Sequence, residues 1–114
     1  MPYLKIQTNI KSKDKEKLME KASARIAKIL NKEQSYVMIH FEESSDMFFA
    51  QSPEPCLYLE LKSLSLDETK TEEYSKSLCS FFSDELNISP NRIYIEFAHG
   101  ERHMWGWNKK TFAQ

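Results

Sequence analysis

The stretches Val37-Met38-Ile39-His40-Phe41 and Ile93-Tyr94-Ile95-Glu96-Phe97 share an alternating pattern and stand 56 positions apart in the chain. In each, a large apolar residue recurs at every second position, which predicts a β-strand with one buried face. Each follows a segment whose apolar residues recur at helical spacing. These helical series match at the same offset: Leu18, Ala22, Ile26 and Leu30, then Tyr74, Leu78, Phe82 and Leu86. The pattern therefore predicts a duplicated β-α-β unit.

The whole chain is expected to form a single domain, residues 1–114, with a mixed α/β (α+β) fold. Strands are predicted at 3–10, 36–42, 57–62 and 92–97, and helices at 14–30 and within 69–86. The repeats cover about 2–42 and 56–98, and a tail, 99–114, adds short extra strands. Because a β-α-β crossover makes its two strands parallel, two copies predict a four-stranded sheet with both helices on one face.

The other face of this sheet is expected to carry apolar and polar side chains together: Met38, His40, Tyr58, Tyr94 and Glu96. Such a face is too apolar to be left in water, and open sheet edges can pair with another chain. The sequence therefore predicts an oligomer.

Two local patterns predict where the helices begin. Ser12 is a candidate N-cap for the first helix, because its hydroxyl can accept a hydrogen bond from a free backbone N–H. Thr69 and Glu72 have the spacing of a capping box for the second helix.

Composition narrows the function classes. With a net charge of −1, the chain has no excess of basic residues for binding nucleic acid or a membrane surface. It has no apolar run near the ~20 residues of a membrane span and no secretory signal pattern at its start, so a cytoplasmic protein is expected. Cys56 and Cys79 are expected to be buried thiols. His99 and His103, with Glu101, are interpreted as solvated residues and not as a metal site.

Pro2 is the candidate catalytic residue. Removal of Met1 would leave a secondary amine at the chain end, and a terminal amine titrates near pH 7.7–8.0. Burial would lower that pKa further and provide a neutral base for protons on carbon acids. Efficient removal of the initiator followed by an edge strand is the alternative interpretation of the same residue.

Several segments from one end of the chain to the other resemble the macrophage migration inhibitory factor and D-dopachrome tautomerase family, with the inhibitory-factor branch closer. They are Pro2-Tyr3-Leu4, residues 31–36 (NKEQSY), Glu54-Pro55-Cys56, Ser63-Leu64, Tyr74-Ser75-Lys76, residues 88–95 (ISPNRIYI), Gly106-Trp107-Asn108 and Thr111-Phe112-Ala113. The resemblance implies a homotrimer with active sites at subunit boundaries. It also implies a cofactor-free keto–enol tautomerase that acts on phenylpyruvate and, non-physiologically, on dopachrome.

The resemblance implies a role for each matching residue. Pro2 would be the general base, and Lys32 would bind the carboxylate of an α-keto acid. Ser63 and Leu64 match a pair whose second backbone N–H binds the same carboxylate. Tyr94 matches a tyrosine that the adjacent subunit contributes.

Tyr36, Trp105 and Phe112 are expected to form aromatic walls for a phenyl ring. Apart from the resemblance, Lys32 would be interpreted as a solvated lysine, and the aromatic residues, Tyr94 included, as core or interface packing. These interpretations stay open at this stage.

The chain also departs from the family. Glu96 stands where the inhibitory factor has an asparagine, Trp105 replaces a smaller aliphatic residue, and Tyr3 replaces a methionine. A carboxylate near Pro2 would raise the pKa of its amine, whereas the Lys32 ammonium would favour the neutral amine. The carboxylate therefore opposes the effect of Lys32, and we expect weak turnover of dopachrome. Only Cys56 remains of the family's Cys-x-x-Cys, so no thiol–protein oxidoreductase activity of that type is expected.

Two further functions are considered. One is a cytokine-like or host-modulating protein that binds a protein receptor and leaves the cell without a signal peptide, with vestigial catalysis. The other, a related dehalogenase or hydratase, is less favoured, because the extra arginines of such chemistry are not evident near Pro2.

Overall fold

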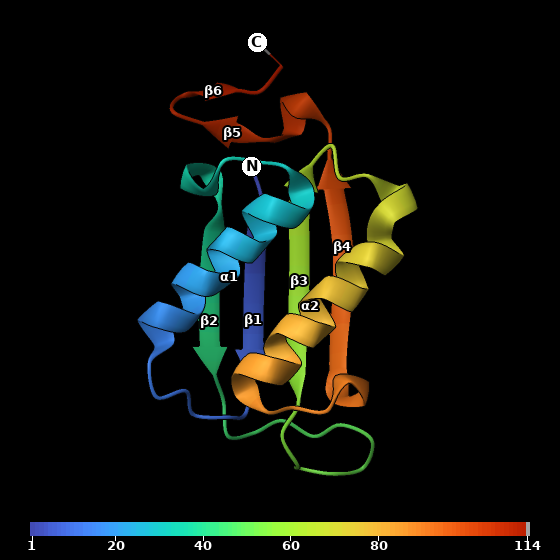
Figure 1. Cartoon of the computed structure of the whole chain (residues 1–114). Coiled ribbons are helices and arrows are strands. Elements are labelled where there is room, and N and C mark those ends of the chain that lie inside the picture. The colour runs from blue at the N-terminus through green and yellow to red at the C-terminus, as the bar shows by residue number, and fades with distance from the viewer. Residues whose placement is uncertain (114) are drawn as a thin grey trace.

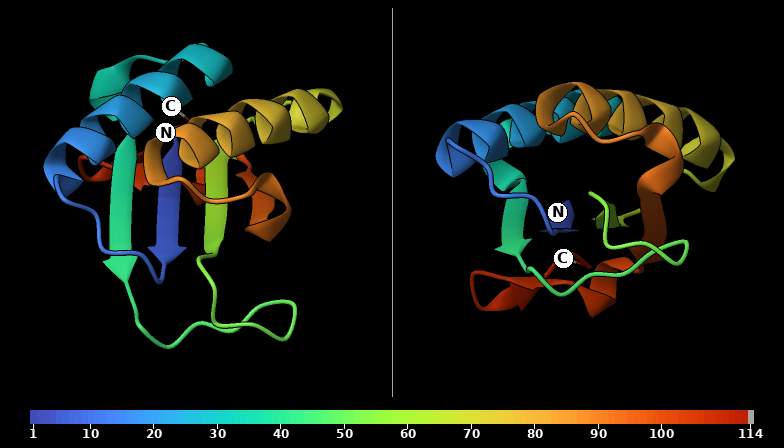
Figure 2. Two further views of the ribbon diagram at one scale, coloured as in Figure 1. Left: turned by 60° about the horizontal axis from the view of Figure 1, so that its bottom comes forward. Right: turned by 90° about the horizontal axis from the view of Figure 1, so that it is seen from below.

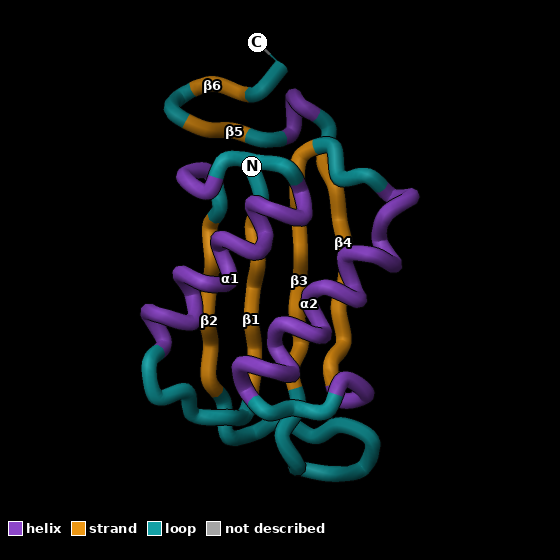
Figure 3. Tube along the Cα trace, in the orientation of Figure 1, coloured by secondary structure: helices purple, strands orange, loops and turns teal. Residues whose placement is uncertain are grey.

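The two halves of the chain lie side by side in one sheet, in a computed structural model that describes residues 1–113. Figure 1 shows the elements, and Figure 3 colours them by type. The main strands are β1 (Tyr3–Thr8), β2 (Met38–Glu43), β3 (Leu57–Leu64) and β4 (Ile93–Gly100), and the helices are α1 (Lys15–Leu30) and α2 (Thr71–Leu86). Short 3-10 turns cover Gln34–Tyr36, Glu68–Lys70, Pro90–Arg92 and Arg102–Met104, and a small hairpin joins β5 (Gly106–Trp107) to β6 (Lys110–Thr111).

The sheet has the strand order β2-β1-β3-β4. β1 pairs with β2 in parallel, and β3 pairs with β4 in parallel, as two β-α-β units require. The two units are joined by the antiparallel pair of β1 and β3 at the centre. The predicted four-stranded sheet is therefore confirmed.

Both helices cover the same face of the sheet (Figure 2). Between them and the sheet lies the core, in which Leu4, Ile6, Leu59 and Leu61 are fully buried. The helices contribute the apolar series that the sequence predicted: Leu18, Ala22, Ile26, Tyr74, Leu78 and Phe82 are all at most 5 % exposed. Residues between the buried ones on the strands point to the opposite, open face, where Met38 and Tyr94 are each 63 % exposed.

The helix starts differ from the prediction. Asp14, not Ser12, caps α1: its side chain accepts a hydrogen bond from the N–H of Lys17 at 3.0 Å. Ser12 instead donates its own N–H to Glu43 Oε1 at 2.9 Å.

The second predicted cap is also wrong. Thr69 lies inside the 3-10 turn Glu68–Lys70, where Asp67 accepts hydrogen bonds from its N–H and its hydroxyl. α2 begins at Thr71 with no side-chain cap.

The strand limits shift for related reasons. β1 ends at Thr8 because the Asn9 side chain turns to the segment before β3, donating to Pro53 O and accepting from the N–H of Cys56. Tyr36 lies in a 3-10 turn before β2, and β4 continues to Gly100.

The β5–β6 hairpin lies beyond the strand ends near the N-terminus, on the side away from the helices (Figure 2). None of the helices within residues 1–113 is long and apolar enough to cross a bilayer.

Candidate active site

Pro2 stands at the start of β1, an inner strand of the sheet, and its side chain is fully buried. Its carbonyl oxygen accepts a hydrogen bond from the N–H of Met38 at 2.9 Å, which ties this end of the chain to β2. On the other side, Tyr3 pairs with Lys62, so the next residue, Ser63, lies beside Pro2 at the end of β3. The fold therefore gives Pro2 a fixed, enclosed position. With Met1 in place, the Pro2 nitrogen is an amide.

Lys32 reaches the same end of the sheet from α1. The helix ends at Leu30, and Asn31 adopts a left-handed conformation (φ 54°) that turns the chain back. The N–H of Lys32 donates to Ala27 O at 2.9 Å, which secures that turn. Burial and, secondly, the Lys32 ammonium lower the pKa of the Met1 amine below its ordinary value. An amine at this chain end is thus shifted toward its neutral form.

Lys32 and Ser63 line one cavity of about 180 Å³ between the end of α1, the end of β3 and the start of α2. Ser63 is 1 % exposed, and its hydroxyl donates to the carbonyl of Leu64 at 3.3 Å. Leu64 is also buried and pairs with Gly100 of β4. Pro2, Lys32, Ser63 and Leu64 therefore lie at the same end of the sheet, and of these four Lys32 and Ser63 line the cavity. Lys70 and Tyr74 line the same cavity and were not predicted as site residues.

Aromatic side chains gather near this end, but not all those predicted. Tyr36 meets Trp107 edge to face, with ring centroids 5.9 Å apart, and Phe112 stacks on Trp107 at 6.2 Å. Trp105 instead packs against Gly100 at the end of β4. Its carbonyl accepts the N–H of Phe112 at 3.1 Å. Trp107 is therefore the central residue of this aromatic cluster, and it was not among the predicted site residues. It does belong to Gly106-Trp107-Asn108, one of the segments that resemble the family.

Tyr94 and Glu96 lie away from Pro2 in the single chain. Tyr94 pairs with Tyr58 of β3, which pairs with Gln7 of β1. Gln7 is five residues beyond Pro2, or about 16 Å along the strand. Tyr94 there packs on Phe49, with centroids 4.6 Å apart.

Glu96 is held on the open face by a hydrogen bond. Its Oε1 accepts from the Tyr58 hydroxyl at 3.2 Å, and the same hydroxyl lies 3.1 Å from Glu60 Oε1. One hydroxyl proton is therefore shared between two carboxylates. Burial and these carboxylates raise the pKa of Tyr58 to about 12.

The cysteines and histidines are separate from this site. Cys56 is buried as expected, whereas Cys79 is only half-buried, because it lies at the edge of the core-facing side of α2. His99 pairs with Glu68 at 3.2 Å, and His103 pairs with Glu101 at 3.4 Å, both at the surface. Within residues 1–113, no three His, Cys, Asp or Glu side chains form a group that could hold a metal ion.

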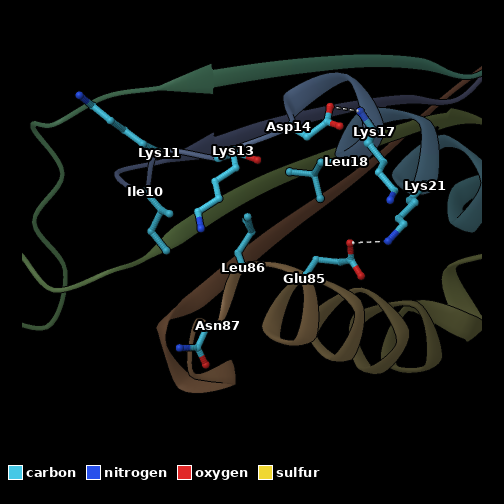
Figure 4. Close-up of a pocket in the computed structure, with 11 residues that line it drawn as sticks. Ile10, Lys11, Lys13, Asp14, Lys17, Leu18, Lys21, Glu85, Leu86 and Asn87 are labelled. Atoms are coloured by element: carbon cyan, nitrogen blue, oxygen red, sulfur yellow. Dashed lines mark hydrogen bonds and ion pairs between the residues drawn. The ribbon is translucent and has the colours of Figure 1, made fainter.

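A larger cavity, of about 360 Å³, lies between the start of α1 and the end of α2 (Figure 4). Lys21 and Glu85 form an ion pair across it at 3.2 Å. None of the predicted site residues lines it. The candidate active site is therefore the other end of the sheet, where Pro2 lies.

Comparison with known proteins agrees with this architecture. The family model described as "Macrophage migration inhibitory factor (MIF)" matches residues 1–113. A macrophage migration inhibitory factor homolog from Brugia malayi is 38% identical over 99% of this chain and 100% of its own length. The macrophage migration inhibitory factor of Meriones unguiculatus is 33% identical over the same shares.

Among solved structures, a macrophage migration inhibitory factor homologue from Prochlorococcus marinus has a TM-score of 0.89 at 34% identity. The alignment covers 96% of this chain and 98% of that one. Sequence and fold therefore agree over nearly the whole length, and the chain belongs to the macrophage migration inhibitory factor family.

Proposed function

We propose that the chain without Met1 is a cofactor-free keto–enol tautomerase with Pro2 as its general base. The observation that carries the proposal is the position of Pro2, which is fully buried at the end of the sheet where burial and Lys32 lower the pKa of the preceding Met1 amine. An amine of lowered pKa is partly neutral at physiological pH and can accept a proton. Membership in the family supports a tautomerase kind of activity.

The reaction needs one base and one anion site. The Pro2 nitrogen takes the enol hydroxyl proton of the substrate, and the resulting ammonium delivers a proton to the carbon next to the forming ketone carbonyl, which gives the keto form. The reverse direction removes the α-proton and protonates the carbonyl oxygen. Lys32 holds the substrate carboxylate as an ion pair, and the backbone N–H of Leu64 adds a hydrogen bond. No redox step or covalent intermediate is required.

The substrate class that fits this arrangement is an aryl α-keto acid, with phenylpyruvate as the test compound. The aromatic cluster of Tyr36, Trp107 and Phe112 provides apolar surface near the same end of the sheet. Glu96 adds a negative charge where the family has an amide, which favours the charged amine of Pro2. Weak turnover of dopachrome is therefore expected.

We further propose that three copies assemble into a homotrimer, so that Tyr94 and Glu96 of one subunit reach the site of its neighbour. The large separation of Tyr94 from Pro2 within one chain supports this assembly. So does the exposure of the open face at Met38 and Tyr94. Sedimentation at micromolar concentration tests it, and a monodisperse monomer would contradict it.

The test of catalysis compares phenylpyruvate enol–keto conversion in the wild type and Pro2→Gly, after intact mass has confirmed loss of Met1 from both. Glycine keeps a terminal amine but loses the ring, and we expect a fall of about 100-fold or more. Lys32→Gln should raise KM, whereas Lys28→Gln, an exposed lysine in the last turn of α1, should not. Equal rates in wild type and Pro2→Gly would refute the assignment.

A second function, recognition of a protein receptor, is favoured by the names of the relatives, which describe inhibition of macrophage migration. Receptor binding that survives Pro2→Gly would show that such signalling does not need catalysis. Binding lost together with activity would tie the two to one site.

A further inference from the structure

The cavity that Lys32 and Ser63 share extends away from the open face, toward the helices. We refer to it as the Lys32–Lys70 pocket. It is lined by Ile29, Leu30, Asn31, Lys32, Ser63, Ser65, Leu66, Asp67, Lys70 and Tyr74. Its volume of about 180 Å³ is well below the ~300–1,000 Å³ of pockets that enclose drug-sized molecules. The pocket is therefore the size for a small ion, not for an aryl substrate.

Tyr74 supplies an unpaired polar group to this pocket. The residue is only 5 % exposed, yet its hydroxyl forms no hydrogen bond with any of residues 1–113. No fully enclosed side-chain nitrogen or oxygen among residues 1–113 lacks a partner, so this hydroxyl is accessible to solvent or to a ligand. An anion bound in the pocket could accept the proton of this hydroxyl.

The charge state of Tyr74 suits a donor. Burial is the main cause that raises the pKa of Tyr74, and the negative charges of Asp67 and Glu73 follow. Asp67 and Tyr74 both line the pocket. Asp67 itself is occupied, because its Oδ1 accepts two hydrogen bonds from Thr69. Tyr74 therefore keeps a proton to donate.

Two ammonium groups complete the pocket. Lys32 comes from the end of α1 and Lys70 from the turn before α2. Neither forms an ion pair within 4.0 Å with residues 1–113. The charged residues of the lining are Lys32, Lys70 and Asp67, so positive charge exceeds negative charge there. Ammonium groups and a hydroxyl donor are groups that bind tetrahedral oxyanions.

We propose that the Lys32–Lys70 pocket binds a free inorganic oxyanion of the phosphate class through the ammonium groups of Lys32 and Lys70 and the hydroxyl of Tyr74. Binding of the ion does not depend on the tautomerase proposal. Because Lys32 is also the proposed partner of the substrate carboxylate, an oxyanion bound here competes for that lysine. The ion would then raise KM for an α-keto acid.

The test is a titration of inorganic phosphate into the wild-type chain at constant ionic strength, followed by amide NMR. We expect saturable shifts at Ser63, Ser65 and Tyr74. Tyr74→Phe and Lys70→Met should each weaken phosphate binding about tenfold, because each removes one hydrogen-bond donor to the charged ion. Lys76→Met, at an exposed lysine of α2, is the control and should bind as the wild type does.

Tyr74→Phe keeps the ring that packs near Phe97, so its fold can be verified from the spectrum before titration. Lys70→Arg should restore binding if charge at this position is what matters. Absence of saturable shifts in the wild type, or equal weakening in Lys76→Met, would overturn the proposal.

A second arm separates a free ion from a substrate carboxylate. Pyruvate is titrated under the same conditions into the wild type and into Tyr74→Phe. Phosphate binding that depends on Tyr74, with pyruvate binding that does not, supports a separate oxyanion site. If pyruvate alone binds and needs Tyr74, the pocket is instead part of the substrate carboxylate site, and the proposal is wrong. Loss of activity in Pro2→Gly with phosphate binding intact would show that the two proposals are independent.

Discussion

The indole of Trp105 lies directly on Gly100, so that a Cβ added at Gly100 would stand 2.6 Å from Cδ1 of the indole and closer still to Nε1. The last residue of β4 must therefore have no side chain for Trp105 to take this position. Trp105 in turn holds the tail, because its carbonyl accepts the N–H of Phe112. The close contact between strand and indole thus helps to position the aromatic cluster around Trp107.

We predict that Gly100→Ala displaces Trp105 and loosens the tail. The added methyl group would need the indole to move, and overpacking of this kind costs about 1–3 kcal/mol. The free energy of unfolding should fall accordingly, and tryptophan fluorescence of the folded protein should change. Gly106→Ala is the matched control, because a Cβ there meets only Lys110 O, at an ordinary 3.5 Å. Equal effects of the two substitutions would contradict the role given to Gly100.

A second prediction concerns the start of α1. Asp14→Ala should lower the free energy of unfolding by about 1 kcal/mol, because the N–H of Lys17 loses its partner. Ser12→Ala should have little effect, since the contribution of Ser12 is its backbone N–H to Glu43. Urea unfolding of both variants distinguishes the two residues. A larger loss in Ser12→Ala would show that Ser12 is the cap after all.

The contrast between these residues shows which parts of the fold the sequence predicts well. The strand order within each unit and the buried faces follow from periodicity that extends over many residues. A cap depends on one hydrogen bond, and Ser12 and Asp14 are both good cap residues two positions apart. The choice between them depends on Glu43, which β2 brings to the N–H of Ser12. The residues next to Ser12 and Asp14 in the sequence do not predict that contact, because Glu43 is 31 residues from Ser12.

The site shows the same limit. Pro2, Lys32 and Ser63 were predicted from a resemblance that extends along the chain, and the structure brings them to one end of the sheet. The resemblance suggests Trp105 as an aromatic wall, but only the packing of the hairpin determines that Trp107 is the residue that meets Tyr36. Lys70 and Tyr74 line the pocket because α2 begins beside the end of α1, a relation that no local motif encodes.

A third prediction concerns acid stability. A backbone hydrogen bond from Ser12 is the main cause that lowers the pKa of Glu43, and Lys15 at 3.3 Å contributes. A carboxyl whose pKa is lower in the folded chain stabilises the fold while ionised, and this stabilisation is lost as pH falls through the folded pKa. Stability should therefore decline as the pH falls below the ordinary pKa of glutamate, about 4.3.

Glu43→Gln should make that decline shallower, because the amide does not titrate. Urea unfolding at a series of pH values measures the difference. Glu33→Gln is the control, since the Glu33 side chain forms no hydrogen bond or ion pair with residues 1–113. The prediction fails if both variants follow the same pH dependence as the wild type.

The last prediction concerns Tyr58, whose hydroxyl lies between two carboxylates on the open face. Its raised pKa, about 12, means that Tyr58 should ionise above the ordinary tyrosine pKa of about 10, which ultraviolet absorbance of tyrosinate can follow. Glu60→Gln should lower this pKa, and Glu96→Gln should lower it less, because Glu60 has the larger influence. The ionisation that disappears in Tyr58→Phe is the one that belongs to Tyr58.

Glu42→Gln provides the control for these titrations, since Glu42 bonds to Gln7 and not to Tyr58. Because the unfolded chain ionises its tyrosines near pH 10, the folded state binds the Tyr58 proton more tightly between about pH 10 and 12. Stability should therefore fall as pH rises through that range, and Tyr58→Phe should reduce the fall. If Tyr58→Phe removes a transition near pH 10 instead, then Glu60 and Glu96 do not share its proton.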